Sequence, residues 1–361
     1  MIPALVMKRK NFRILLFYIL AWSLAIAFFI FLRHELGNQE FSDLIEKNKA
    51  PHISIAKTII YEILVIGISA GSIFAIIDLY IAKYFRSILS LGVFFILITL
   101  LNLSALSIIT YLAIFSINEL LQIQLSLKDF TTGHHVFIIY GFIVSFLVGF
   151  TREMDRKLGS GNLWKLFIGK FYKPRQLERI FMFIDLTSST RIAEEIGNIK
   201  YSSLLRDCFK DLAVVANFSA EVYQYVGDEV VLNWNPNKGL KNNNAIHAFF
   251  AFQAYINSNK EYYLEQYGVV PVFKASAHIG QVTVTEVGEL KSEICYHGDI
   301  LNTTSRIQSL CSSFNCNLLI SDRLKKRLEE DALLSHEALG SHNLKGKKEK
   351  VTIWKTELNH D

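Results

Sequence analysis

Four long apolar runs occur before residue 151, and they constrain the fold of this chain more than any other feature. The runs cover residues 12–32, 58–82, 88–117 and 135–150. Because about 20 apolar residues in a helix cross the hydrocarbon core of a bilayer, each run is a candidate membrane span. The third run is longer than one span needs, so we expect it to tilt or to extend beyond the bilayer. We predict a transmembrane domain of four helices over residues 1–150.

Composition and charge agree with this prediction. The chain is 51% hydrophobic and 13% aromatic, and its formal charge is only +5, which gives no basic stripe for nucleic acid. Basic residues instead flank the runs, and cytoplasmic loops carry such an excess. The flanking residues are Lys8, Arg9, Lys10, Arg13, Lys83, Arg86, Arg152, Arg156 and Lys157. We therefore predict a multi-pass protein of the cell (inner) membrane with both termini in the cytoplasm. No signal-peptide pattern is present.

Small residues recur at four-residue spacing in two of the runs. Gly67 and Gly71 form one stripe, and Gly141, Ser145 and Gly149 form another. Such stripes let helix backbones approach closely in lipid. Two interpretations remain open: a dimer seam, or packing within one four-helix bundle.

Several polar residues lie in or beside the runs. Glu62 and Asp78 lie near opposite ends of the second run, where each either marks a functional polar site or reaches the lipid headgroups. Histidines at four flanking positions are expected to be solvated at the interface rather than to hold haem or a metal. They are His34, His52, His134 and His135.

Residues 151–177 form a predicted cytoplasmic linker between the runs and a second domain. Residues 159–161 are a flexible Gly-Ser-Gly break, and residues 163–171 are a short amphipathic stretch. This stretch is interpreted as an interfacial helix lying on the membrane, or as an element that couples the two domains; the two interpretations are compatible.

From residue 178 the pattern becomes a mixture of strands and helices typical of a mixed sheet covered by helices. Predicted strands cover residues 179–186, 221–226, 229–234, 272–279, 281–287, 293–296, 317–320 and 351–356, and predicted helices cover 189–218, 244–264 and 299–311. The four cysteines form no CxxC pair, so we expect reduced thiols. They are Cys208, Cys295, Cys311 and Cys316.

Two aspartates lie at strand ends in this domain. Asp185 ends a buried strand, and Asp228 follows a glycine at a hairpin tip. Carboxylates placed in this way suit Mg²⁺ or Mn²⁺, which prefer oxygen ligands. Two aspartates alone are weak support for a metal site.

The motifs around these aspartates resemble class III adenylyl and guanylyl cyclases of the membrane-anchored, bacterial type. FMFIDLTSST at residues 181–190 and YVGDE at 225–229 resemble the two metal motifs of that family. GDILNTTSR at 298–306 is similar to its transition-state helix, and LKGK at 344–347 to its late phosphate-binding turn. Four motifs in the right order cover residues 178–357. The resemblance implies an α+β catalytic domain of ferredoxin-like or palm type over residues 178–361.

The resemblance also implies a role for each matching residue. Asp185, Asp228 and the Leu186 carbonyl would hold two metal ions, Mg²⁺ or Mn²⁺. Asn302 would position the ribose, and Arg306 would stabilise charge at the α-phosphate. Ser188, Ser189, Thr190 and Lys345 would bind phosphates, with Ser188 standing where the family usually has glycine.

The base-selecting pair departs from the family pattern. Adenylyl cyclases of this family present Lys and Asp to the base, and guanylyl cyclases present Glu and Cys. The matching residues here are Gln224 and Cys295, and glutamine can contact either purine. Because bacterial-type cyclases often vary this pair, we expect ATP as substrate, with GTP as the alternative.

In this family one subunit supplies the metal aspartates and the other supplies the helix that carries Asn302 and Arg306. A single chain with the whole set therefore implies a homodimer that converts ATP to cyclic AMP and pyrophosphate in signal transduction. A diguanylate cyclase would lack the 298–306 helix and the 344–347 turn. A catalytically silent receptor would usually lose an aspartate or the arginine. Four spans with few charges offer no path for a transporter.

Overall fold

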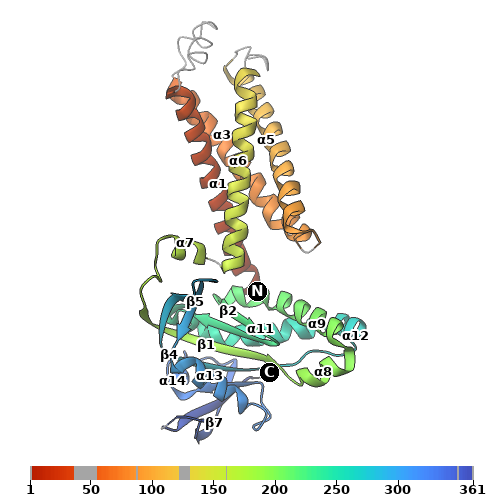
Figure 1. Ribbon diagram of the computed structural model, residues 1–361, viewed down its shortest axis with the longest axis vertical. Helices are drawn as coiled ribbons and strands as arrows, with labels where there is room; N and C mark the ends of the chain where they lie inside the picture. Colours follow the sequence, from red (N-terminus) through yellow and green to blue (C-terminus); the bar gives the residue numbers. More distant parts are fainter. Residues whose placement is uncertain are drawn as a thin grey trace. The chain divides into compact units, whose positions relative to one another are not determined.

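The chain divides into two units, Met1–Lys157 and Leu158–Asp361, here called the helical unit and the sheet unit (Figure 1). The computed structural model describes residues 2–35, 55–86, 88–121, 131–159, 161–347 and 349–359. Of the residues named above, the side chains of Lys8, Arg9, Lys10 and Glu62 and of the four span-flanking histidines lie outside the described part.

The described residues of the helical unit are mainly helical. The helices are α1 (Ile2–Glu35), α3 (Ile55–Ile76), the π-helix η1 (Ile77–Ala82), α4 (Lys83–Phe85), α5 (Leu91–Leu121) and α6 (Thr131–Leu158). Within the described residues, four stretches are long and apolar enough to cross a membrane: Asn11–Leu32, Ile63–Phe85, Leu91–Leu112 and Val136–Leu158. A helix suits lipid because it satisfies its own backbone hydrogen bonds. The fourth stretch continues to Leu158, past the predicted end at residue 150, and three of the charged residues in its last turns, Arg152, Glu153 and Arg156, form ion pairs.

The glycines of α3 bring its backbone against α1. A Cβ on Gly71 would lie 2.5 Å from the Ile19 Cα, and one on Gly67 would lie 2.7 Å from the Ser23 Oγ. This stripe is therefore filled by a helix of the same chain, as packing within one bundle requires. On α6, a Cβ on Gly141 would lie 2.6 Å from Leu106 Cδ2, whereas Gly149 has nothing within 4 Å.

Five charged residues meet where η1 and α4 lie against α6, and we call them the arginine–carboxylate cluster: Asp78, Arg86, Arg152, Glu153 and Arg156. Asp78 pairs with Arg86 and, at 3.2 Å, with Arg152, whereas Glu153 pairs with Arg156 and, at 3.2 Å, with Arg86. Both carboxylates are buried. Asp78 is therefore held inside the unit by two arginines. Removing one partner from such a pair leaves a costly buried charge.

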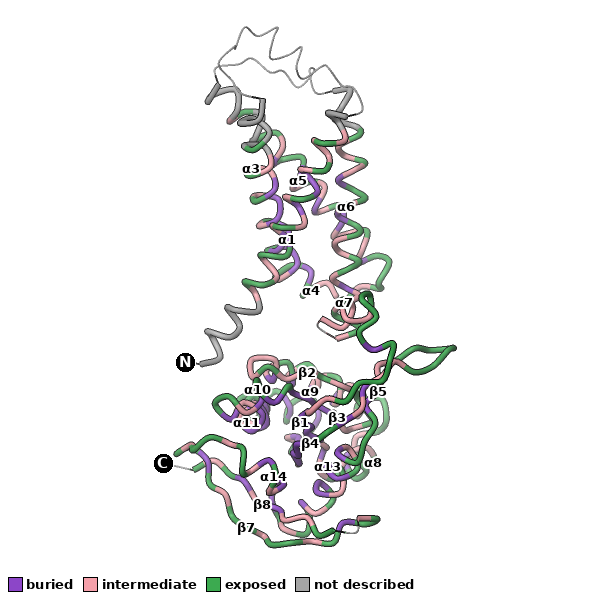
Figure 2. The backbone as a smooth tube through the Cα atoms, turned by 90° about the vertical axis from the view of Figure 1, so that its left-hand side faces the viewer, coloured by how far each residue is buried: buried purple, intermediate pink, exposed green. Residues whose placement is uncertain are grey.

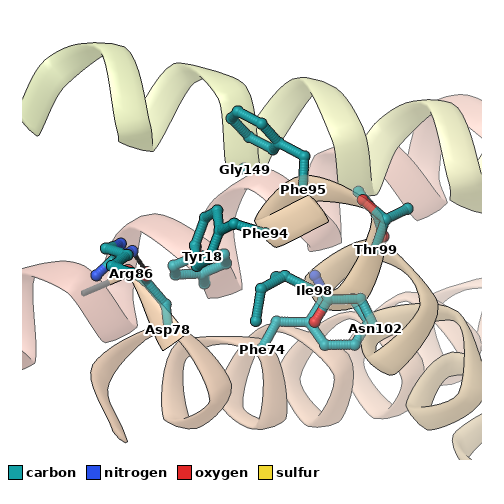
Figure 3. A pocket seen from close by; sticks show the side chains of 11 residues that line it. Tyr18, Phe74, Asp78, Arg86, Phe94, Phe95, Ile98, Thr99, Asn102 and Gly149 are labelled. Atoms are coloured by element: carbon teal, nitrogen blue, oxygen red, sulfur yellow. Dashed lines mark hydrogen bonds and ion pairs between the residues drawn. The ribbon is translucent and has the colours of Figure 1, made fainter. Parts of the chain in front are cut away.

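A small polar cavity adjoins this cluster (Figure 3). Its volume is about 20 Å³, which is room for about one water molecule. The side-chain oxygens of Asn102 and Ser145 line it, and neither has a hydrogen-bond partner within the described residues. A buried water is the simplest partner for both.

The sheet unit is built on a mixed sheet of eight strands. Its strands are β1 (Arg175–Leu186), β2 (Glu221–Val226), β3 (Glu229–Trp234), β4 (Phe273–Val287), β5 (Glu293–His297), β6 (Leu318–Ser321), β7 (Leu334–His342) and β8 (Val351–Leu358). The order is β2-β3-β1-β4-β6-β8-β7, and β5 pairs with β4. Only the β4–β6 pair is parallel among these.

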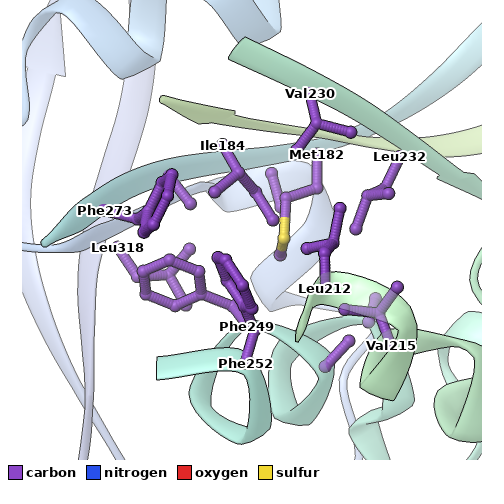
Figure 4. Packing of buried hydrophobic residues seen from close by; sticks show 14 of the residues in the cluster. Met182, Ile184, Leu212, Val215, Val230, Leu232, Phe249, Phe252, Phe273 and Leu318 are labelled. Atoms are coloured by element: carbon purple, nitrogen blue, oxygen red, sulfur yellow. The ribbon is translucent and has the colours of Figure 1, made fainter. Parts of the chain in front are cut away.

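Helices of the sheet unit cover the strands and connect them. They are α7 (Asn162–Phe167), α8 (Ser189–Ile196), α9 (Asn198–Asp211), η3 (Leu212–Phe218), α10 (Pro236–Gly239), η4 (Lys241–Asn243), α11 (Asn244–Ser258), α12 (Lys260–Tyr267), α13 (Asp299–Ser309) and α14 (Asp322–Lys325). Because successive strand residues point to opposite faces, β1 contributes to two separate cores. Met182 and Ile184 pack with Phe249 and Phe252 of α11 in the larger core (Figure 4). Phe181 belongs to the core on the other face. Buried positions, purple in Figure 2, gather around these central strands.

The sheet unit differs from the sequence-based expectation in several places. The helix expected over residues 244–264 is divided at Asn259 into α11 and α12. Strand β1 begins at Arg175 rather than at residue 179. Strand β4 runs unbroken from Phe273 to Val287, although Gly280 suggested a break. The helix expected over residues 189–218 is divided at Gly197, whose φ of 78° ends α8. Strand β7 (Leu334–His342) was not expected, because its sequence alternates weakly between apolar and polar residues.

The close approach of α3 to α1 generates a prediction. Gly71→Ala would drive a Cβ into the α1 backbone, which cannot turn aside as a side chain can. We expect a loss of about 1–3 kcal/mol, the usual cost of overpacking, seen as a lower melting temperature of the purified chain in detergent. Gly149→Ala is the matched control, because nothing lies within 4 Å of Gly149. Equal melting temperatures for the two variants would contradict the packing described.

Candidate active site

The pairing of β1 with β3 brings two aspartates to one edge of the sheet. Asp185 lies opposite Glu229, the residue after Asp228. The turn between β2 and β3 contains Gly227, whose φ of 61° favours glycine. Burial raises the pKa of Asp185, and the nearby charge of Asp228 raises it further, against the hydrogen bond from Lys274. The two carboxylates are therefore close enough to interact strongly.

Two further charged residues belong to this edge, and sequence motifs did not predict them. Lys274 of β4 lies opposite Asp185, and its Nζ is 3.1 Å from the Asp185 Oδ2. Burial raises the pKa of Glu229 to about 7, and the charges of Asp185 and Asp228 contribute to this shift. Lys274 and Glu229 could be found as site residues only from the register of the strands, because each lies directly opposite Asp185.

The site therefore carries more negative than positive charge. Three carboxylates meet one ammonium group within the described residues around Asp185. Within the described part of the chain, no group of three or more His, Cys, Asp or Glu side chains has the arrangement of a metal site by side chains alone. Two adjacent carboxylates and a backbone oxygen are nevertheless a donor set that suits Mg²⁺ or Mn²⁺. The residues present fit such ions, because a divalent cation would offset the repulsion between Asp185 and Asp228.

The loop after β1 leads into α8 through a left-handed residue. Ser188 has φ 57° and ψ 33°, and α8 begins at the next residue, Ser189. A residue with a Cβ adopts this conformation at a cost, which explains why glycine is the usual family residue at this position. Tyr201 of α9 also lies here, since Asp228 and Ser189 both influence its hydroxyl, whose pKa is raised mainly by burial. Thr190 is exposed.

Helix α13 presents Asn302 and Arg306 on its outer face. They lie four residues apart, whereas the buried face carries Ile300, Thr303, Thr304, Ile307 and Gln308. A Cβ on Gly346 would lie 3.4 Å from the Arg306 guanidinium, so the 344–347 turn lies against this arginine. Lys347 of that turn pairs with Asp299 at 2.6 Å, while Lys345 is exposed. The helix and the turn thus form one cationic surface.

Gln224 and Cys295 lie on strands that tyrosines bring together. The Tyr223 and Tyr296 rings are 5.0 Å apart, and the Tyr223 hydroxyl is 3.4 Å from the Tyr296 nitrogen, in a contact where that nitrogen donates. Gln224 follows Tyr223 on β2 and is exposed, and Cys295 precedes Tyr296 on β5 and is half-buried. The two residues predicted to select the nucleotide base, Gln224 and Cys295, therefore each lie next to one of the two tyrosines in this contact.

Within one chain, the aspartate edge and the outer face of α13 carry different candidate residues, and the buried face of α13 reaches the edge where Gln308 lies near Glu229. No hydrogen bond or ion pair in the described part of the chain joins Arg306 to Asp185 or Asp228. The structure thus assembles the metal residues into one group, and Asn302, Arg306 and the 344–347 turn into another.

Comparison with known proteins identifies the family. Residues 172–356, which are 185 of the 361 residues, match the adenylate and guanylate cyclase catalytic domain. The chain belongs to this family of cyclases. Adenylate cyclase 2 of Rhizobium meliloti (strain 1021) is 32% identical over 217 residues, which are 60% of this chain and 60% of that protein. The chain thus spans less than two thirds of the length of this relative.

Two further relatives show how far the likeness extends. The photoactivated adenylate cyclase subunit beta of Euglena gracilis is 31% identical over 81 residues, 22% of this chain and 9% of that protein. The structure of a bacterial light-regulated adenylyl cyclase has a TM-score of 0.51 at 16% identity, covering 61% of this chain and 64% of that chain. This last comparison establishes the fold of the sheet unit, a mixed sheet with helices as the resemblance implied.

A buried histidine behind α13 makes the sheet unit sensitive to acid. His278 of β4 is bonded to the Ser321 hydroxyl at 2.7 Å. Burial lowers the pKa of His278 to about 4, and the charges of Lys347 and Arg323 act in the same direction against Asp299. The unfolded chain binds a proton at this residue near pH 6.5 and the folded chain does not, so stability falls as the pH drops from 6.5 towards 4.

We therefore expect the melting temperature of the sheet unit to decrease over that pH range, with up to about 3 kcal/mol lost at this site. His278→Asn should flatten the dependence, as measured by thermal unfolding of the full chain in detergent at a series of pH values. The control is His297→Asn, which changes an exposed histidine. An unchanged pH profile for His278→Asn would contradict the assignment.

Proposed function

We propose that this chain is a membrane-bound adenylate cyclase that converts ATP to cyclic AMP and pyrophosphate at a homodimer interface. The observation that carries the proposal is the pairing of β1 with β3, which places Asp185 beside Asp228 in a chain of the cyclase family. The other parts of the proposal follow from the groups around this pair.

Asp185, Asp228 and the main-chain oxygen of Leu186 would hold two Mg²⁺ or Mn²⁺ ions. Such ions activate a hydroxyl and steady a leaving phosphate. Lys274, in contact with Asp185, orients this carboxylate and limits the repulsion at the site before a cation binds.

The remaining residues bind and orient the nucleotide. Ser188, Ser189 and Thr190 lie at the start of α8, where free backbone N–H groups favour phosphate. Arg306 offers a planar fork of donors to the α-phosphate as the ribose 3′-oxygen attacks. Asn302, one turn earlier on the same face, bonds the ribose, and exposed Lys345 reaches the terminal phosphates. Positioning and charge stabilisation supply most of the acceleration in such a reaction.

The homodimer is proposed from the family resemblance, in which one subunit supplies the metal aspartates and the other supplies the helix that carries Asn302 and Arg306. A two-fold interface repeats each contact, so two shared sites form when the aspartate edge of one chain faces α13 of the other. The helical unit would favour this pairing, because tethering in one membrane raises the local concentration of partners. Its four apolar stretches support a multi-pass anchor in the cell membrane with the sheet unit in the cytoplasm.

ATP is the proposed substrate because the relative that matches over 217 residues is an adenylate cyclase. Cys295 favours a second candidate, guanylate cyclase, since the family's guanylyl members use cysteine there. A catalytically silent receptor is a third candidate, and the assays below separate all three.

The two-chain site predicts complementation between inactive variants. The full chain in detergent with Mn²⁺ should convert ATP to cyclic AMP, whereas Asp185→Ala and Arg306→Ala should each abolish the reaction. Co-expression of the two variants should restore about a quarter of the wild-type rate, because half of the dimers then contain one intact site of two. Chromatography of the product measures the rate.

Two results would contradict parts of this proposal. No recovery on co-expression, with both variants dimeric, would place the whole site in one chain. No cyclic nucleotide from either ATP or GTP in the wild-type dimer would support a silent receptor. Lys260→Ala, at an exposed position of α12, is the control for expression and assay.

Gln224 and Cys295, which flank the tyrosine contact, are expected to determine substrate choice. Gln224→Lys combined with Cys295→Asp should raise the ratio of cyclic AMP to cyclic GMP formed from mixed ATP and GTP, because it restores the family's adenylyl pair. Gln224→Glu with Cys295 retained should lower the ratio, because it completes the family's guanylyl pair. A ratio that neither change alters would remove both residues from the base site.

A further inference from the structure

The segment that enters the sheet unit exposes large apolar side chains. Trp164, Phe167, Ile168 and Tyr172 are 65%, 81%, 53% and 79% exposed. The rings of Trp164 and Phe167 stack with centroids 5.6 Å apart. Single exposed apolar residues are ordinary on protein surfaces, but four within nine residues form a patch that calls for a partner. We name residues 162–175, from α7 to the start of β1, the aromatic–basic segment.

This patch is held in place and is not a frayed end. Phe171, in the middle of the segment, is buried among Phe181, Val282 and other residues of the smaller core. Its carbonyl accepts hydrogen bonds from the Glu286 nitrogen at 2.9 Å and from the Thr285 hydroxyl at 3.4 Å. Lys165 adds an ion pair with Glu221 at 3.7 Å. The fold therefore anchors one side of the segment and leaves the aromatic side outward.

The charge of the segment identifies the partner. No acidic residue occurs between Arg156 and Leu177, and the same stretch contains six basic residues. Lys170, Lys173 and Arg175 are exposed beside the aromatic side chains. Aromatic rings next to lysine and arginine are characteristic of the membrane–water interface, and each basic residue is attracted to an anionic leaflet.

The chain itself brings the segment to a bilayer. The last candidate span ends at Leu158, and Trp164 follows six residues later. An extended chain of that length reaches at most about 20 Å. Trp164 therefore lies within about 20 Å of the end of the last span whenever α6 spans a membrane, close enough for the segment to reach the headgroups.

We propose that the aromatic–basic segment docks the sheet unit on the anionic lipid surface. Trp164, Phe167, Ile168 and Tyr172 insert among the headgroups, and Lys170, Lys173 and Arg175 contact lipid phosphates. The docking rests on the membrane anchoring proposed above. It gives β1, which begins at Arg175 and ends near Asp185, a fixed starting point at the membrane.

Fluorescence quenching by brominated lipids tests the docking directly. The full chain is reconstituted in phosphatidylcholine liposomes with or without phosphatidylglycerol, and the emission of Trp164 is obtained as the difference between wild type and Trp164→Phe. We expect brominated acyl chains to quench this emission, more strongly when phosphatidylglycerol is present. Trp354, half-buried and bonded to Asp322 at 3.2 Å, is the control: the same difference for Trp354→Phe should show no quenching.

Charge reversal provides a second measurement. Lys170→Glu with Lys173→Glu should reduce the quenching of Trp164 by about half in anionic liposomes, because each reversal removes an attraction and adds a repulsion. Lys260→Glu with Lys350→Glu reverses two exposed lysines elsewhere and should change nothing. Melting temperatures equal to wild type show that the variants are folded.

The outcomes separate this proposal from the proposed function. Failure of the chain to float with the liposomes would refute the membrane anchoring, and loss of cyclic AMP formation would concern the active site alone. A chain that floats but shows no quenching of Trp164 overturns the docking. Efficient cross-linking of Phe167→Cys to a second copy, without quenching, would also overturn it, by assigning the patch to a protein contact.

Discussion

The pairing of β1 with β3 on one side and β4 on the other is the constraint on which the sheet unit depends. It divides the apolar residues between two cores, because alternate residues of β1 face opposite sides. The same register sets the site: Asp185 lies across from Glu229 on one neighbour and from Lys274 on the other. Packing and chemistry thus share one cause, and a slip of one residue would disrupt both.

How much of the site could be predicted follows from how local each signal is. Asp185 and Asp228 lie in short motifs, and the structure places them together as the motifs implied. Lys274 and Glu229 were missed as members of the site, because their contribution depends on which residue lies opposite Asp185. Ser188 was correctly singled out as unusual, but only its φ of 57° shows why glycine suits the position.

For the helical unit too, the sequence predicted some features and left others to the three-dimensional structure. Apolar length predicted the four apolar helices that are long enough to cross a membrane, since a helix in lipid needs little beyond length and composition. The stripe of Gly67 and Gly71 was recognised, yet its partner on α1 was visible only in three dimensions. The arginine partners of Asp78 were not predicted, because one of them, Arg152, is 74 residues away in sequence. Ionic pairs between distant segments leave no periodic signal.

The arginine–carboxylate cluster limits how the last turns of α6 can move. It clamps the last turns of α6 to η1 and α4, so this end of the helix can neither twist nor slide without separating buried charges. Beyond Leu158, Gly159 and Gly161 both have positive φ, a backbone conformation outside the right-handed helix, so α6 ends here. The paired charges therefore fix α6 in its last turns before the helix stops.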